Sequence, residues 1–116
     1  MAYSLAGHPP LLRYCSQQRV IVEYASQNLP LCILPEQEFT TDQLECDPGD
    51  VLLLLTDGFS EVFDANAAEL GIEPIKSAFL KSADRPLSEI FEHLRNVSLS
   101  FGKQDDDQTI LLVRCT

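Results

Sequence analysis

The chain has 116 residues, a length typical of one domain with one hydrophobic core, and its 45% hydrophobic and 22% charged residues are ordinary for a globular protein. Its 18 acidic residues against eight lysines and arginines give a formal net charge of −10, which disfavours nucleic acid and anionic membranes as partners. No apolar run approaches the roughly 20 residues that cross a bilayer, and the N-terminus lacks the layout of a signal peptide, so we expect a cytoplasmic protein.

The first part of the chain predicts short strands separated by turns. Segments 11–14 and 20–24, joined by a polar turn, predict a hairpin, so the sheet is at least partly antiparallel. Pro30 and Pro35, near the two ends of the run 29–34, limit it to a short or edge strand. The strands expected before the middle of the chain cover residues 3–6, 11–14, 20–24, 29–34 and 39–46.

The stretch 49–61 is the most informative part of the sequence. A run of aliphatic residues at 51–55 follows a turn signal and predicts a strand buried on both faces, which delivers Asp57 at its C-terminal end. Gly58 allows a sharp turn, and 59–63 is typical of the first turns of a helix. Such an acid either caps a helix or holds a metal ion, and both interpretations are open at this point.

Beyond this turn the apolar residues follow a helical period. Two amphipathic helices are predicted behind Pro74 and Pro86, and 109–114 predicts a closing buried strand. The order of elements predicts an α+β fold, an antiparallel sheet with two amphipathic helices on one face. Because 52–55 and 110–113 are apolar on both faces, the second face of the sheet needs a cover, from a missing segment or a second copy.

An acidic loop at Asp105, Asp106 and Asp107 stands directly before the closing strand, as Asp57 stands directly after the strand 51–55. If these strands are antiparallel neighbours, both acidic segments lie at the same edge of the sheet. Carboxylate oxygens suit Mg²⁺ or Mn²⁺, whereas the simpler interpretation is a solvated loop.

Several motifs in order resemble those of a known family. They are Ala6-Gly7-His8-Pro9-Pro10, Pro48-Gly49-Asp50, Thr56-Asp57-Gly58 with Glu61, Glu69-Leu70-Gly71 and Asp106-Asp107-Gln108-Thr109. Together they are similar to the C-terminal part of PPM-type (protein phosphatase 2C-like) metal-dependent serine/threonine phosphatases, in the sporulation stage II E (SpoIIE) branch. The resemblance covers nearly the whole chain.

The resemblance implies part of a four-layer α-β-β-α sandwich, with two Mn²⁺ or Mg²⁺ ions in the complete domain. It implies hydrolysis of phosphoserine or phosphothreonine by a metal-activated water, without a phosphoenzyme. It further implies signal transduction in bacterial sigma-factor regulation. The expected substrate is a phosphorylated regulatory protein of the anti-sigma-factor antagonist type.

By the same resemblance, Asp57 and Asp106 are the metal ligands. Alignment of the Asp-Asp-x-Thr motif on Thr109 selects Asp106 over Asp105 and Asp107. Gly58 would allow close approach of the backbone, and Asp107 would order the loop beside the ligands. His8 stands where other branches of the family carry Gly-Asp-Ser, and its role near the site is open.

The family's N-terminal half, with an Asp-x-x-Gly-His-Gly metal motif, is absent from residues 1–116. We therefore expect a partial domain that supplies part of the ligand set, is inactive alone and depends on an N-terminal half or sensor domain. The alternative is a non-catalytic phosphatase-like module that self-associates, for example as a homodimer, or binds a partner protein. His93 is expected to be solvated and the four cysteines to be free thiols in a reducing compartment.

Overall fold

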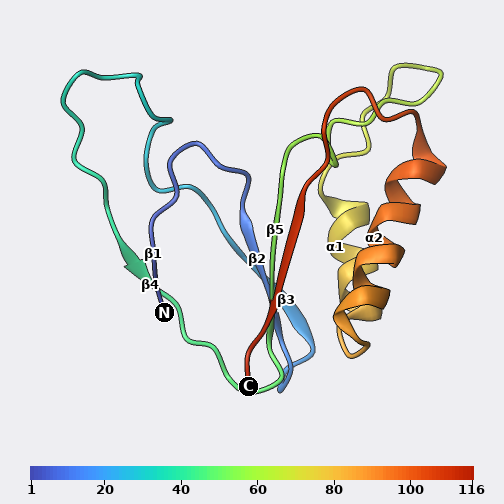
Figure 1. Cartoon of the computed structure of the whole chain (residues 1–116), viewed down its shortest axis with the longest axis horizontal. Helices are drawn as coiled ribbons and strands as arrows, with labels where there is room; N and C mark the ends of the chain where they lie inside the picture. The colour runs from blue at the N-terminus through green and yellow to red at the C-terminus, as the bar shows by residue number, and fades with distance from the viewer.

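A four-stranded antiparallel sheet with strand order β3-β2-β5-β6 forms the centre of the computed structural model, which describes residues 1–116 (Figure 1). A separate two-stranded sheet pairs β1 with β4. The α+β prediction is confirmed. The elements are β1 (Ala2–Tyr3), β2 (Leu11–Cys15), β3 (Val20–Tyr24), β4 (Asp42–Gln43), β5 (Val51–Leu55), α1 (Glu73–Ser82), α2 (Leu87–Phe101) and β6 (Ile110–Arg114).

Strand β5 lies in the interior of the sheet, between β2 and β6. Leu53 is opposite Leu12 on one side and Leu112 on the other, and both pairings are antiparallel. The side chains of Val51 and Leu53 are completely inaccessible to solvent. A strand flanked by two others and covered on both faces is the environment that a continuous aliphatic run favours.

Both helices pack on the same face of the sheet, as Figure 1 shows. Helix α1 begins with a proline in its first turn, as the sequence predicts, and buries Ile75 and Phe79. Helix α2 follows Pro86 and buries Ile90 and Leu94 through its apolar stripe. These side chains meet the inward residues of β2 and β5 in one core of 14 buried residues.

The second face of the sheet is covered only in part. Leu5 and Leu44, from the segments around β1 and β4, pack on Leu11 and Leu52 in a small second core. On the edge strand β6, Leu111 is 55% exposed and Val113 is 37% exposed. The N-terminal segments therefore shield the β2 and β5 side of this face, and the β6 side stays open.

Several predicted elements differ from the structure. The strands expected at 3–6 and 39–46 are reduced to β1 and β4, of two residues each, and the closing strand, expected to be buried, is the partly exposed edge strand β6. Two predicted elements are absent. Residues 29–34 form bends and turns instead of a strand, because prolines at both ends cannot donate ladder bonds and no strand lies beside the run. Residues 59–63 form a turn and a β-bridge instead of a helix. The N–H of Leu70 donates to the carbonyl of Val62 at 2.8 Å, so the backbone of this segment pairs with a later loop.

The turn before β5 is held by the carboxylate of Asp50, whose burial the sequence did not predict. Asp50 is 1% exposed and accepts hydrogen bonds from Arg13 Nε (2.9 Å), Ser16 N (2.9 Å), Ser16 Oγ (2.9 Å) and Asp47 N (3.1 Å). Arg13 Nη2 also lies 2.8 Å from Asp50 Oδ2. The ion pair joins β2 to the start of β5.

A disulfide between Cys46 and Cys115 ties the segment before β5 to the end of β6, with the Cα atoms 6.3 Å apart. The prediction of four free thiols is therefore wrong for this pair. Cys15 is a buried free thiol and Cys32 an exposed one. The pairing joins residues 69 positions apart, which no local spacing rule indicates.

Candidate functional site

Three loops with polar side chains meet at one edge of the central sheet. Because β5 runs antiparallel to β2 and to β6, its C-terminal end lies beside the starts of both neighbours. The loop 56–58 after β5 is therefore next to 105–109, before β6, and 7–10, before β2 (Figure 1). The predicted convergence of the two acidic segments at one edge of the sheet is confirmed.

Paired threonines join the loops that follow β5 and precede β6. The N–H of Thr56 donates to the Thr109 carbonyl, and the N–H of Thr109 donates to Thr56 Oγ1, both at 3.0 Å. Thr56 Oγ1 also donates to the Asp107 carbonyl at 3.4 Å. These contacts extend the ladder one step beyond the strands and set the register of the acidic loop against Asp57.

A glycine and a glutamine bring the same loops into direct backbone contact. Gln108 Nε2 donates to the Gly58 carbonyl at 3.0 Å and to Ser98 Oγ, on buried α2 surface, at 2.9 Å. A Cβ atom on Gly58 would lie 2.2 Å from the Asp107 carbonyl oxygen. Only a residue without a side chain fits at position 58 while the loops keep this spacing.

The carboxylates themselves face solvent. Asp57, Asp105, Asp106 and Asp107 are all exposed, and Asp106 Oδ1 accepts a hydrogen bond from the Asp107 N–H at 2.8 Å. The three consecutive aspartates and Gln104 line an open hollow of about 280 Å³, whose lining does not include Asp57. The turn at 105–107 is thus ordered by its own side chains as well as by Thr56.

The carboxylate oxygens at this edge are of the type that suits a hard cation, but too few of them lie together to hold one. Carboxylate oxygens are the ligands that Mg²⁺ and Mn²⁺ prefer, and such ions use few protein carboxylates together with water. No group of three or more His, Cys, Asp or Glu side chains in the chain is placed to hold a metal ion. The expectation that Asp57 and Asp106 are metal ligands therefore stays a prediction.

His8 belongs to the third loop at this edge. Its Nδ1 lies 2.6 Å from the Pro9 carbonyl oxygen, which can only accept, so Nδ1 carries a proton and Nε2 is the nitrogen left for another partner. His93 lies on α2 and is half-buried.

Sequence reasoning passed over Thr56, Gln108 and Ser98, which join the loops. Thr56 and Gln108 stand inside the two acidic motifs, so position in a motif was an available signal for both. Ser98 lies inside α2 and gives no such signal.

The family model of stage II sporulation protein E (SpoIIE) matches residues 1–116, the whole chain. The chain belongs to the SpoIIE family. Among proteins with curated functions, none matches the sequence.

Solved structures agree with this family in fold. The SiaA-PP2C domain of Pseudomonas aeruginosa superposes with a TM-score of 0.81 at 21% identity, covering 99% of this chain and 46% of that chain. The RsbU and RsbW domains of a Mycobacterium tuberculosis protein give 0.76 at 23% identity, with 97% and 32% covered. The PP2C phosphatase domain of SpoIIE from Bacillus subtilis, with a fragment of its regulatory domain, gives 0.70 at 24% identity, with 98% and 33% covered.

These matches identify the fold as part of a PP2C-type phosphatase domain. The chain spans less than half the length of each of the three structures. A further structure of the Bacillus subtilis SpoIIE phosphatase domain, presoaked with manganese, has a TM-score of 0.64 at 22% identity. No helix of the SpoIIE-family chain described here is both long and apolar enough to cross a membrane.

Proposed function

We propose that this chain is the C-terminal portion of a metal-dependent serine/threonine phosphatase and that Asp57 and Asp106 supply two of its metal ligands. The observation that carries the proposal is the joining of the two acidic loops through Thr56, Gly58 and their partners across the strand ends. A surface loop without a ligand needs no such alignment with the end of a neighbouring strand.

Bound Mn²⁺ or Mg²⁺ would lower the pKa of a water molecule and neutralise charge on the phosphoryl group. The chain's own contribution is to hold Asp57 and Asp106 at fixed spacing, with the 105–107 turn ordered by hydrogen bonds within the loop. His8 is on the third loop, and its Nε2 is the ring nitrogen left for a substrate or ligand. The remaining ligands come from an N-terminal half of the domain.

The substrate in this proposal is a phosphorylated regulatory protein of the anti-sigma-factor antagonist type. Membership of the SpoIIE family supports this class of substrate and a role in bacterial signal transduction through sigma factors. The net charge of −10 is consistent with a protein substrate and not with a nucleic acid.

Manganese titration followed by NMR tests the ligand assignment. Mn²⁺ should broaden the amide signals of 56–58 and 105–109, and Asp57→Asn and Asp106→Asn should each weaken binding by about tenfold, the loss of roughly 1.4 kcal/mol. Asp105→Asn is the matched control in the same loop and should change binding less than about twofold, or roughly 0.4 kcal/mol. Equal losses of manganese affinity in Asp105→Asn and Asp106→Asn would show that alignment on Thr109 selects the wrong ligand.

An activity assay tests the incompleteness of the site. The 116-residue chain with manganese should hydrolyse para-nitrophenyl phosphate no faster than its Asp57→Asn variant, because its ligand set lacks a third acidic or histidine group. Turnover comparable with that of a complete phosphatase domain would contradict the partial-site proposal.

A second candidate function is a non-catalytic module that self-associates or binds a protein through the open sheet face. The exposed Leu111 (55%) and Val113 (37%) on one edge strand favour it. Light scattering at increasing concentration should then show association that Leu111→Asp abolishes. A strictly monomeric chain that binds no hydrophobic dye would remove the basis for this function.

A further inference from the structure

A polar cavity lies at the opposite edge of the sheet from Asp57 and Asp106. Its volume is about 600 Å³, within the range of small-molecule sites. Its lining comes from the β2–β3 hairpin, the turn before β5, the end of α1 and the end of β6. Figure 1 shows these four segments together at the lower end of the sheet.

Three cations line this cavity, although the chain is strongly acidic. Ion pairs engage Arg13, Lys76 and Arg95 among the eight lysines and arginines. The five without an ion pair are Arg19, Lys81, Arg85, Lys103 and Arg114. The cavity thus collects three of the five free positive charges, those of Arg19, Lys81 and Arg114.

Arg114 is held in place and still has donors to offer. Its Nη2 donates to the carbonyls of Ala83 (3.3 Å) and Arg85, just beyond the end of α1. These bonds satisfy carbonyls whose partial negative charge would otherwise oppose an anion there. The structure gives Nη1 and Nε no hydrogen-bond partner, so two nitrogens of an anchored guanidinium are available in the cavity.

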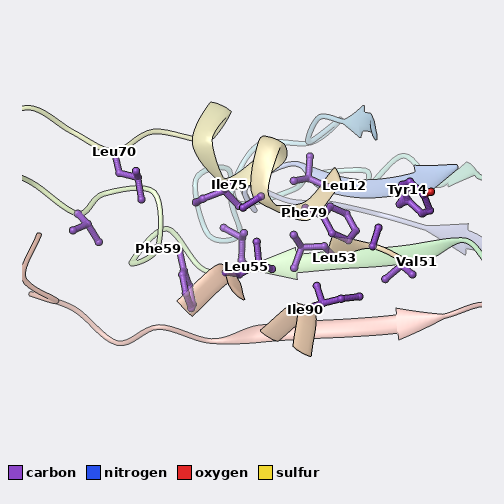
Figure 2. Packing of buried hydrophobic residues seen from close by; sticks show 14 residues of the cluster. Leu12, Tyr14, Val51, Leu53, Leu55, Phe59, Leu70, Ile75, Phe79 and Ile90 are labelled. Carbon is purple, nitrogen blue, oxygen red and sulfur yellow. The ribbon is translucent and has the colours of Figure 1, made fainter. Parts of the chain in front are cut away.

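A tyrosine hydroxyl provides a further donor. The Tyr14 side chain is 7% exposed, packs in the main core and lines the cavity. Figure 2 shows its oxygen at the end of the ring that points away from Phe79. The hydroxyl makes no hydrogen bond within the protein, and it is not among the buried polar atoms that lack a partner, so it is accessible from the cavity. A ligand there can accept a hydrogen bond from it.

We propose that this cavity binds the phosphate group of a small phosphorylated molecule. Arg19, Lys81 and Arg114 surround the phosphate, which Arg114 contacts through charge-assisted hydrogen bonds and Tyr14 through its hydroxyl. Asp84 is the one acid in the lining. Its carboxylate repels a phosphate placed beside it. It instead accepts a hydrogen bond from a hydroxyl group elsewhere on the phosphorylated ligand.

This site is separate from the candidate metal site. Gly49 lines the cavity, and Asp57 follows the far end of β5, so the extended strand between them places the two sites about 25 Å apart. A phosphate in the cavity is therefore not the phosphoryl group on which the proposed phosphatase acts. Binding in the cavity does not require a metal ion at the candidate metal site.

Isothermal titration and NMR of the protein in the presence of EDTA test the proposal, with inorganic phosphate and ribose 5-phosphate as probes. Both probes should bind saturably and shift the amide signals of Gly49 and Arg114. Arg19→Gln and Lys81→Gln should each weaken binding about tenfold, and Tyr14→Phe, which keeps the ring in the core, about threefold.

A variant with Arg95→Gln and Lys103→Gln is the matched control. It removes the same two charges as the Arg19→Gln, Lys81→Gln double variant, and it should bind both probes within about twofold of the unmodified protein. Equal losses in the two double variants would show diffuse attraction only and overturn the site. Absence of saturable binding of either probe without metal would overturn it as well.

Discussion

Replacing Gly58 with alanine tests whether the two acidic loops depend on direct backbone contact. The new Cβ would lie 2.2 Å from the Asp107 carbonyl oxygen and 3.1 Å from its carbon, against an ordinary contact of 3.4–4 Å. The neighbouring atoms are backbone, and the hydrogen bonds of Thr56 and Gln108 limit their movement. The loop must therefore move back by more than about 1 Å, which overpacks the site.

The cost follows from these contacts. Overpacking of about 1–3 kcal/mol and one weakened hydrogen bond of about 1 kcal/mol are partly offset by the lower entropy of the unfolded alanine chain, about 0.4–1 kcal/mol. We expect a net loss of about 2 kcal/mol, which lowers Tm by roughly 8 °C in a domain of this size. Displacement of Asp107 should also weaken manganese binding.

Chemical denaturation and NMR spectra measure both effects, with Gly71→Ala as the control. Gly71 has φ +72°, and no atom lies within 4 Å of a Cβ placed there, so that variant carries only the strain of the left-handed backbone, about 1 kcal/mol. A Gly58→Ala protein as stable as Gly71→Ala, with unshifted signals at 107–109, would refute the reasoning.

Two other predictions concern the scaffold. Burial alone would raise the pKa of Asp50, but backbone and side-chain hydrogen bonds, including that from Arg13, outweigh it and hold the pKa below the usual 3.8. The stability that this carboxylate contributes is therefore present above pH 3.8 and is lost as pH falls through the lower folded-state pKa. Asp50→Asn should lower the free energy of unfolding by about 3–5 kcal/mol at pH 7 and flatten the acidic part of the stability–pH curve. An unchanged acidic part of the curve would contradict this assignment. Thiol titration of the unreduced, unfolded chain should find two thiols, rising to four after reduction. Reduction should lower the free energy of unfolding by about 4 kcal/mol, because Cys46 and Cys115 close a long loop. Four thiols before reduction would contradict the pairing.

The local sequence pattern was sufficient to predict the elements that have a clear periodicity or a proline at their start. The aliphatic run of β5, the hairpin of β2 and β3, and the two helices behind Pro74 and Pro86 all appear as predicted. In each, side-chain periodicity or a proline constrains the backbone before any distant contact forms. The helix predicted to begin at 59–63 is absent because the backbone of this segment pairs with later loops instead. Helix propensity is a weak guide where tertiary contacts decide the conformation.

The order of the motifs along the chain was enough to identify the family and to place Asp57 and Asp106 beside strands. The three-dimensional fold was needed to show that β5 lies between β2 and β6, so that their loops share an edge. It also decided which face of the sheet stays open, which cysteines pair, and that Arg19, Lys81 and Arg114 line one cavity. Each of these depends on residues far apart in the chain, and spacing along a sequence carries no information about which distant segment becomes a neighbour.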